Sequence, residues 1–180
     1  MASFVALDFE TANNSRDSAC ALAVVRVDDG RVVEERYRLI RPPTPSFLFT
    51  GIHGITWRHV KDEPTFDGAW PHLAELIEGV DFLVAHNAPF DRGVLRACCA
   101  RYGLAEPQLP WLDTVRAAKK RWGLPRNRLP DVWVISLCPT PECQIRCCFS
   151  SSAGSRLWLF SPGYSLVSFR FWVGHFSVFL

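Results

Sequence analysis

Residues 4–11, Phe-Val-Ala-Leu-Asp-Phe-Glu-Thr, constrain the fold more than any other part of this sequence. Their short apolar run is rich in strand-forming residues, so we expect a buried β-strand. Asp8 and Glu10 stand two residues apart in it, which places both side chains on the same face. Carboxylates held this close are stabilised by a cation, and their hard oxygen ligands favour Mg²⁺ or Mn²⁺. The alternative is a strand that ends in two ordinary solvated acids.

A second apolar run, residues 82–85, predicts another buried strand, and it is followed by His-Asn-Ala-Pro-Phe-Asp. Pro89 suits the first turn of a helix, where its missing N–H costs nothing. Asp91 is therefore expected in that first turn, near the carboxyl end of the strand. If the two strands are parallel neighbours, Asp91 approaches the acidic pair. Three converging carboxylates can hold a two-metal site of the kind that cleaves phosphodiesters.

Three motifs in this order resemble those of the proofreading 3′–5′ exonucleases, the family of the bacterial DNA polymerase III epsilon subunit and its stand-alone relatives. They are Asp-Phe-Glu-Thr at 8–11, Ile-His-Gly-Ile-Thr at 52–56 and His-Asn-Ala-Pro-Phe-Asp at 86–91. Together with Leu-Asp-Thr at 112–114, they extend the resemblance over residues 4 to about 131. The resemblance implies an α/β fold of the ribonuclease H-like type, a mixed sheet flanked by helices.

The same resemblance implies the roles of the three acidic residues. Asp8 would bridge two metal ions, Glu10 would bind one ion and orient the attacking water, and Asp91 would help to hold the second ion. The expected cofactors are therefore two Mg²⁺ or Mn²⁺ ions. The expected substrate is a single-stranded DNA or RNA 3′ end, and a DNA polymerase is a candidate partner.

Five further residues beside these motifs are expected to bind the substrate: Thr11, Ile52, His53, His86 and Asn87. In the segment at 50–56, an isoleucine side chain would lie against a base of the terminal nucleotide. Simple loop packing explains the same residues equally well. The two histidines are expected to donate hydrogen bonds or contact substrate rather than to act as the general base.

The family pattern also requires a late His-x-x-x-x-Asp element, which supplies a fourth carboxylate and the general base. In this sequence the only histidine after His86 is His175, and no aspartate follows Asp131. By resemblance, the metal site lacks one ligand and the reaction lacks its base. We therefore expect a 3′–5′ exonuclease with impaired activity. The alternatives are a catalytically inactive nucleic-acid-binding module and a non-functional truncated product.

The composition changes abruptly at Trp133. All but one of the 18 acidic residues and every lysine lie before it, and the remainder shows no helical or strand period. We expect a C-terminally incomplete exonuclease domain over residues 1–132 and an aberrant, irregular tail over 133–180. A shifted reading frame or an unspliced intron would produce such a tail, and a divergent extension is the alternative.

The net charge of +2 gives no broad basic field, so any contact with nucleic acid is expected to be local. The N-terminal apolar run is the predicted strand, which argues against a signal peptide. An odd number of cysteines, seven, is consistent with a reducing compartment such as the cytoplasm. The apolar residues 157–180 are interrupted by Pro162, Gly163 and Arg170, so we expect no membrane span.

The remaining elements follow from periodicity and turn residues. Asp-Asp-Gly at 28–30 predicts a hairpin between strands at 19–27 and 32–40. A loop is expected over 44–63, and helices are expected over 67–78, over 89–102 and from about Asp113 to Lys120. Hairpin strands followed by strand–helix alternation predict a mixed sheet.

Overall fold

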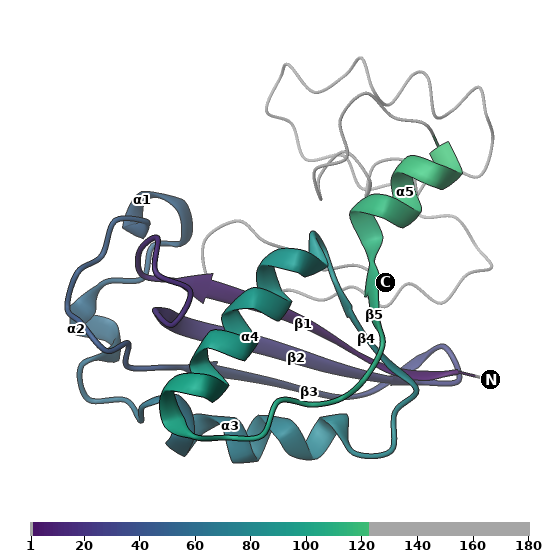
Figure 1. Ribbon diagram of the computed structural model, residues 1–180, viewed down its shortest axis with the longest axis horizontal. Helices are drawn as coiled ribbons and strands as arrows, with labels where there is room; N and C mark the ends of the chain where they lie inside the picture. The colour runs from purple at the N-terminus through teal and green to yellow at the C-terminus, as the bar shows by residue number, and fades with distance from the viewer. Residues whose placement is uncertain (1, 123–180) are drawn as a thin grey trace, which may run out of the picture. The chain divides into compact units, whose positions relative to one another are not determined.

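The computed structural model describes residues 2–122, in which five strands form one mixed sheet (Figure 1). The strand order is β3-β2-β1-β4-β5. Strand β1 pairs antiparallel with β2 and parallel with β4. This agrees with the mixed sheet predicted from hairpin strands followed by strand–helix alternation. The predicted mixed α/β sheet is therefore confirmed. The strands are β1 (Ser3–Thr11), β2 (Ala19–Asp28), β3 (Arg31–Leu39), β4 (Phe82–Ala85) and β5 (Trp111–Asp113).

The predicted hairpin joins β2 to β3 through a two-residue turn. Asp28 pairs with Arg31, and the residues between them, Asp29 and Gly30, both have positive φ angles, +53° and +75°. A turn of this kind matches the right-handed twist of the flanking strands, and it favours Asp-Gly because other residues rarely adopt positive φ. The local sequence therefore determines this connection.

Helix α4 (Ala88–Tyr102) follows β4 and connects it to the parallel strand β5. It begins after Asn87, which has a φ of +71°, and Pro89 occupies its first turn as predicted. It ends at Gly103 in the left-handed conformation, where the Gly103 N–H donates to a carbonyl of the last turn. These boundaries agree with the predicted helix.

Strand β5 was not predicted. It has only three residues, which pair in parallel with β4, and so short a segment shows no period in the sequence. Its last residue, Asp113, directly precedes helix α5 (Thr114–Trp122). The predicted helix that begins near Asp113 is thus present.

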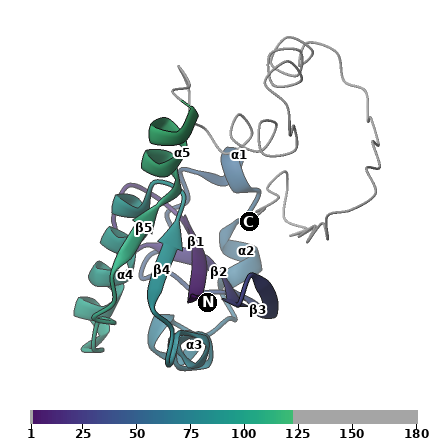
Figure 2. The ribbon, with the colours of Figure 1, turned by 90° about the vertical axis from the view of Figure 1, so that its right-hand side faces the viewer.

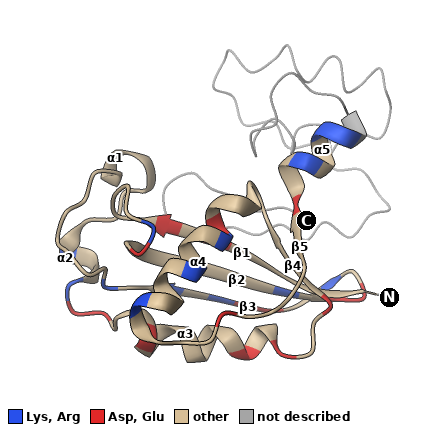
Figure 3. Cartoon of the chain, in the orientation of Figure 1, with Lys and Arg blue, Asp and Glu red and all other residues tan. Residues whose placement is uncertain are grey.

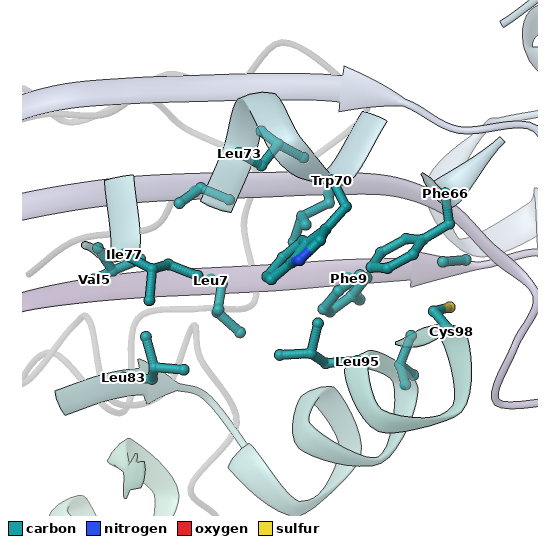
Figure 4. Close-up of a cluster of buried hydrophobic side chains, with 14 of the residues drawn as sticks. Val5, Leu7, Phe9, Phe66, Trp70, Leu73, Ile77, Leu83, Leu95 and Cys98 are labelled. Atoms are coloured by element: carbon teal, nitrogen blue, oxygen red, sulfur yellow. The ribbon is translucent and has the colours of Figure 1, made fainter. Parts of the chain in front are cut away.

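The apolar core lies on one face of the sheet, where alternate residues of β1 point toward helices α3 (Phe66–Ala74) and α4 (Figure 4). Val5, Leu7 and Phe9 are all less than 5% exposed there. Phe66 stacks on Trp70 with ring centroids 5.4 Å apart. The helix predicted over 67–78 is divided into α3 and a 3₁₀ turn, η1 (Glu75–Ile77).

A smaller apolar cluster lies beside the end of β1, formed by Ala12, Cys20, Ala21, Ile55 and Val60. The pairing of β1 with β2 shifts register between Glu10 and Thr11, so that successive β2 residues reach this cluster. Ala12 directly follows β1, whereas Ile55 and Val60 come from the segment predicted as a loop. This cluster therefore anchors that segment at the carboxyl end of β1.

The segment at 44–63 contains two single-turn helices, α1 (Thr50–His53) and α2 (Trp57–Val60), rather than loop alone (Figure 2). At the start of α2, Thr56 and His59 form a reciprocal capping box. Four residues are too few to show a helical period, and histidine is not the usual partner in that box. The sequence therefore gave little sign of either helix.

Residues up to Thr114 form one compact unit, and α5 belongs to a second unit from Val115 onward. The predicted tail, residues 133–180, lies outside the described residues, so its irregularity stays a prediction. Within residues 2–122, no helix has the length and apolar character needed to cross a membrane. Cys20, Cys98 and Cys99 are buried free thiols.

Candidate active site

The acidic pair lies at the carboxyl end of β1, which is red in Figure 3. Alternation along the strand turns both side chains to the face opposite the main core. Phe9 points into that core and is 3% exposed, whereas its neighbours Asp8 and Glu10 are half-buried. Their partners on β2 are Ala23 and Ala21. These methyl side chains leave room beside both carboxylates. The same-face arrangement expected from their spacing is therefore present.

Asp91 approaches the pair from the first turn of α4 and is only 2% exposed. Its Oδ1 accepts a hydrogen bond from the backbone N–H of Phe9, at 3.0 Å. The last pair between β1 and β4 is Ala6 with Val84, so β1 extends beyond the end of β4. The Asp91 carboxylate thus accepts the Phe9 N–H, which has no partner residue on β4. This contact joins residues 82 positions apart in the sequence.

Burial raises the pKa of all three carboxyl groups, and the charge of Asp8 adds to the rise at Glu10 and Asp91. Burial raises the pKa of Asp8 to about 6. Burial, and then the charge of Asp8, raise the pKa of Glu10 to about 7. Burial, and then the charge of Asp8, raise the pKa of Asp91 to about 8 against the opposing hydrogen bond from Phe9. Among the described residues, no Lys or Arg contributes to these shifts.

Three carboxyl groups that repel one another and lack a basic partner among the described residues have the donor chemistry that suits a hard divalent cation. Within residues 2–122, however, no group of three or more His, Cys, Asp or Glu side chains is arranged so that it could hold a metal ion as it stands. The described residues thus supply ligands of the right kind but not a completed coordination shell. A bound cation would have to draw the three carboxylates together.

His53 joins residues 48–56, here called the α1 segment, to the end of β1. Its ring is 2% exposed, and its Nδ1 accepts a hydrogen bond from the Ile55 N–H at 3.0 Å. Because Nδ1 is an acceptor, the proton lies on Nε2, which donates to the Thr11 carbonyl at 3.1 Å. Burial lowers the pKa of His53, which favours this neutral form. Both ring nitrogens are therefore used in holding the segment to the strand.

Two apolar side chains of the same segment face solvent. Leu48 and Ile52 are each 63% exposed, among the most exposed large apolar residues that the structure describes. The backbone beneath them is held firmly, because the Leu48 N–H donates to the Ala12 carbonyl at 2.7 Å and the Phe49 N–H donates to the same oxygen. The result is a fixed apolar surface next to the end of β1.

His86 and Asn87 follow β4 at the same end of the sheet. His86 is half-buried, and its Nδ1 lies 2.9 Å from the Thr114 hydroxyl. Asn87 is exposed, and its backbone N–H donates to Asp113 Oδ1 at 3.2 Å. The Leu-Asp-Thr motif therefore fixes the turn that leads into α4.

The sequence matches the RNase_T family model, described as an exonuclease, over residues 5–133. The chain belongs to the RNase_T exonuclease family. Exodeoxyribonuclease 10 of Escherichia coli strain K12 is 36% identical over 104 residues, which are 56% of this chain and 40% of that protein. The PolC-type DNA polymerase III of Thermotoga petrophila is 31% identical over 121 residues, 66% of this chain and 9% of that protein.

The fold agrees with this assignment. The solved structure of exonuclease X in complex with 5′ overhanging duplex DNA superposes with a TM-score of 0.61 at 25% identity, covering 80% of this chain and 86% of that one. The ribonuclease H-like fold and the exonuclease resemblance are therefore confirmed. The chain spans less than half the length of the curated relatives named here.

In this RNase_T family member, the structure brings Asp91 to the strand that carries Asp8 and Glu10, as predicted. Of the five predicted substrate residues, Ile52 and Asn87 are exposed and His86 is half-buried. Thr11 and His53 are buried in the support of the α1 segment. Sequence reasoning missed the exposed Leu48, because a single leucine in a predicted loop carries no signal.

Proposed function

We propose that this RNase_T family chain is a metal-dependent 3′–5′ exonuclease that hydrolyses phosphodiester bonds at single-stranded DNA or RNA 3′ ends, with impaired activity because no His-x-x-x-x-Asp element follows Asp91 in the sequence. One observation carries the proposal: three buried or half-buried carboxyl groups with raised pKa values meet at the end of β1. The exodeoxyribonuclease relative and the DNA-bound exonuclease X structure support a nucleic-acid substrate. The PolC-type relative makes a DNA polymerase a candidate partner.

We assign the cation to Asp8, Glu10 and Asp91, with Mg²⁺ or Mn²⁺ as the ion. When bound there, such a cation would stabilise charge on the scissile phosphate and lower the pKa of an attacking water. Glu10, at the outer end of the strand, orients that water by accepting a hydrogen bond from it. Asp91 is held by the Phe9 N–H, which fixes its carboxylate for binding.

We propose that the α1 segment receives the terminal nucleotide. Ile52 and Leu48 offer an apolar surface for a base, while His53 and Thr11 hold the segment in place beneath them. His86 and Asn87 lie at the end of β4, where a backbone phosphate can be contacted. A buried, neutral His53 thus acts as a support, and the exposed residues make the contacts.

The test measures the release of mononucleotides from a single-stranded oligonucleotide that carries a label at its 3′ end in one experiment and at its 5′ end in another. A 3′–5′ exonuclease releases a 3′ label as mononucleotide at once, but shortens a 5′-labelled strand step by step. The reaction should require Mn²⁺ or Mg²⁺ and stop with a chelator. Release of the 5′ label first, or equal release with chelator present, would contradict the proposal.

A nucleic-acid-binding module without hydrolysis is the second candidate. It is favoured by the observation that residues 2–122 hold no completed group of three metal ligands. In that case the chain binds a fluorescent single strand with the same affinity with and without Mn²⁺, and no mononucleotide appears. Binding and hydrolysis are therefore measured on the same oligonucleotide.

Binding of Mn²⁺ is expected to be weak and to require the carboxylates of Asp8, Glu10 and Asp91. Titration calorimetry with Mn²⁺ should give a binding heat for the full chain that Asp8→Ala removes. Glu35→Gln serves as the control, because Glu35 is an exposed carboxylate on β3. Identical heats for the full chain and Asp8→Ala would refute the assignment of these ligands.

Ile52→Ala is expected to raise the KM for a single strand by roughly 3- to 10-fold with kcat nearly unchanged, because it removes about 1 kcal/mol of apolar contact. Val33→Ala is the matched control, since Val33 is 54% exposed on β3. An unchanged KM in Ile52→Ala would show that this exposed side chain does not contact the nucleotide.

A further inference from the structure

Arg16 lies in the β1–β2 connection and contacts the first turn of α4. Its side chain is exposed at the surface, yet two contacts fix its guanidinium. Nη1 donates to the backbone carbonyl of Phe90 at 2.8 Å, and Cζ lies 4.9 Å from the centre of the Phe90 ring. Phe90 directly precedes Asp91, so Arg16 holds the backbone from which that carboxylate projects.

Gly93 makes this approach possible. A Cβ at position 93 would come within 3.0 Å of Arg16 Nη1 and 3.3 Å of its Cζ. Glycine is unfavourable in the interior of a helix, and Gly93 is the sixth residue of α4. The contact with the guanidinium therefore gives a physical reason for a glycine at this position.

The connection that carries Arg16 is itself firmly held. Asp17 forms an ion pair with Arg101 in the last turn of α4, at 2.8 Å. The Asn13 side chain donates to the Ser46 carbonyl at 2.9 Å. Residues 12–18 thus join the helix of Asp91 to the segment that carries the exposed apolar residues.

Asp91 needs such a restraint. Its carboxylate is joined to β1 through the Phe9 N–H, at 3.0 Å, so a small shift of the helix turn would break that contact. Arg16 contacts the carbonyl and the ring of Phe90. Its action is on the position of the helix turn.

We propose that Arg16 is a positioning residue that sets Asp91 against the end of β1 and thereby supports metal binding; the second part rests on the proposed function. A lysine at this position would keep the charge but lose the planar group that both stacks on Phe90 and donates to its carbonyl. Arg16→Lys is therefore expected to behave like Arg16→Ala.

The direct test is hydrogen exchange of the Phe9 amide, measured by NMR on the full chain without metal. This amide donates to Asp91, so its protection reports the position of the carboxylate whether or not the chain is active. Arg16→Ala should speed its exchange about 10-fold relative to the neighbouring β1 amides. Calorimetry should show about a 10-fold weaker affinity for Mn²⁺ in the same variant.

A second variant separates positioning from general stability. Arg16→Ala/Gly93→Ala restores helix propensity in α4 and should recover much of the Tm that Arg16→Ala loses. Positioning by Arg16 predicts that Phe9 protection and Mn²⁺ affinity stay low in this double variant. Recovery of both along with the Tm would reduce Arg16 to a stabilising residue and overturn the proposal.

Two other outcomes also decide the question. Weaker binding of a single strand by Arg16→Ala with unchanged Phe9 protection would assign Arg16 to a phosphate contact and overturn its positioning role. If the wild-type chain bound no Mn²⁺, the proposed function would fail, but faster Phe9 exchange in Arg16→Ala would still support the positioning of Asp91.

Discussion

Asp8→Asn is expected to lower metal-dependent release of 3′ mononucleotides by about 10²–10³-fold or more, the loss typical of removing one preorganised electrostatic contact in an active site. Asp8 lies on the same face of β1 as Glu10, and its charge raises the pKa of both Glu10 and Asp91. Asp8 is therefore the carboxylate that interacts with both others. The measurement is kcat on a 3′-labelled single strand at saturating Mn²⁺.

The matched control for this variant is Asp62→Asn, which changes an exposed aspartate paired with Lys61. It should retain wild-type kcat. The affinity for the single strand in chelator should be unchanged in both variants, because neither one alters the exposed Leu48 and Ile52. Full activity in Asp8→Asn would mean that hydrolysis takes place at another site.

The second large effect is on stability. Asp91→Asn should raise the stability of the metal-free protein at pH 9 by about 2–4 kcal/mol, because it removes a buried charge while the amide oxygen can still accept the Phe9 N–H. That gain corresponds to a Tm increase of about 10 °C. Thermal unfolding in chelator, followed by circular dichroism, measures it.

The pH dependence has a definite sign. The ordinary pKa values of Asp and Glu are 3.8 and 4.5, and the fold raises those of Asp8, Glu10 and Asp91 to about 6, 7 and 8. The folded state thus favours the protonated carboxyls. Their contribution is fully present below about pH 4 and is lost as the pH rises through 6 to 8.

Wild-type Tm in chelator should therefore fall between pH 5 and pH 9, and the fall should be smaller in Asp91→Asn. Added Mn²⁺ should raise the wild-type Tm at pH 8 and have less effect on the variant. A wild-type Tm that is level across this range would show that folding does not raise the pKa of the three carboxyl groups.

Several features of the fold and site could be predicted because short-range rules determine them. Alternation along a strand puts Asp8 and Glu10 on one face, whatever the rest of the chain does. Pro89 favours a helix start, and Asp29-Gly30 favours a tight hairpin. The three short elements β5, α1 and α2 could not be predicted, since three or four residues carry no measurable period.

The sequence by itself determined the strand that carries the acidic pair, the helix start that carries Asp91, and the chemistry of their oxygen ligands. Only the tertiary structure decided that the Phe9 N–H would hold Asp91, that His53 would be buried as a neutral support, and that Arg16 would lie over Phe90. The contacts of Phe9 with Asp91, of Thr11 with His53 and of Arg16 with Phe90 all join parts of the chain distant in sequence. Their energies depend on burial and on the direction of single donors and acceptors, which arise only when strands and helices pack together.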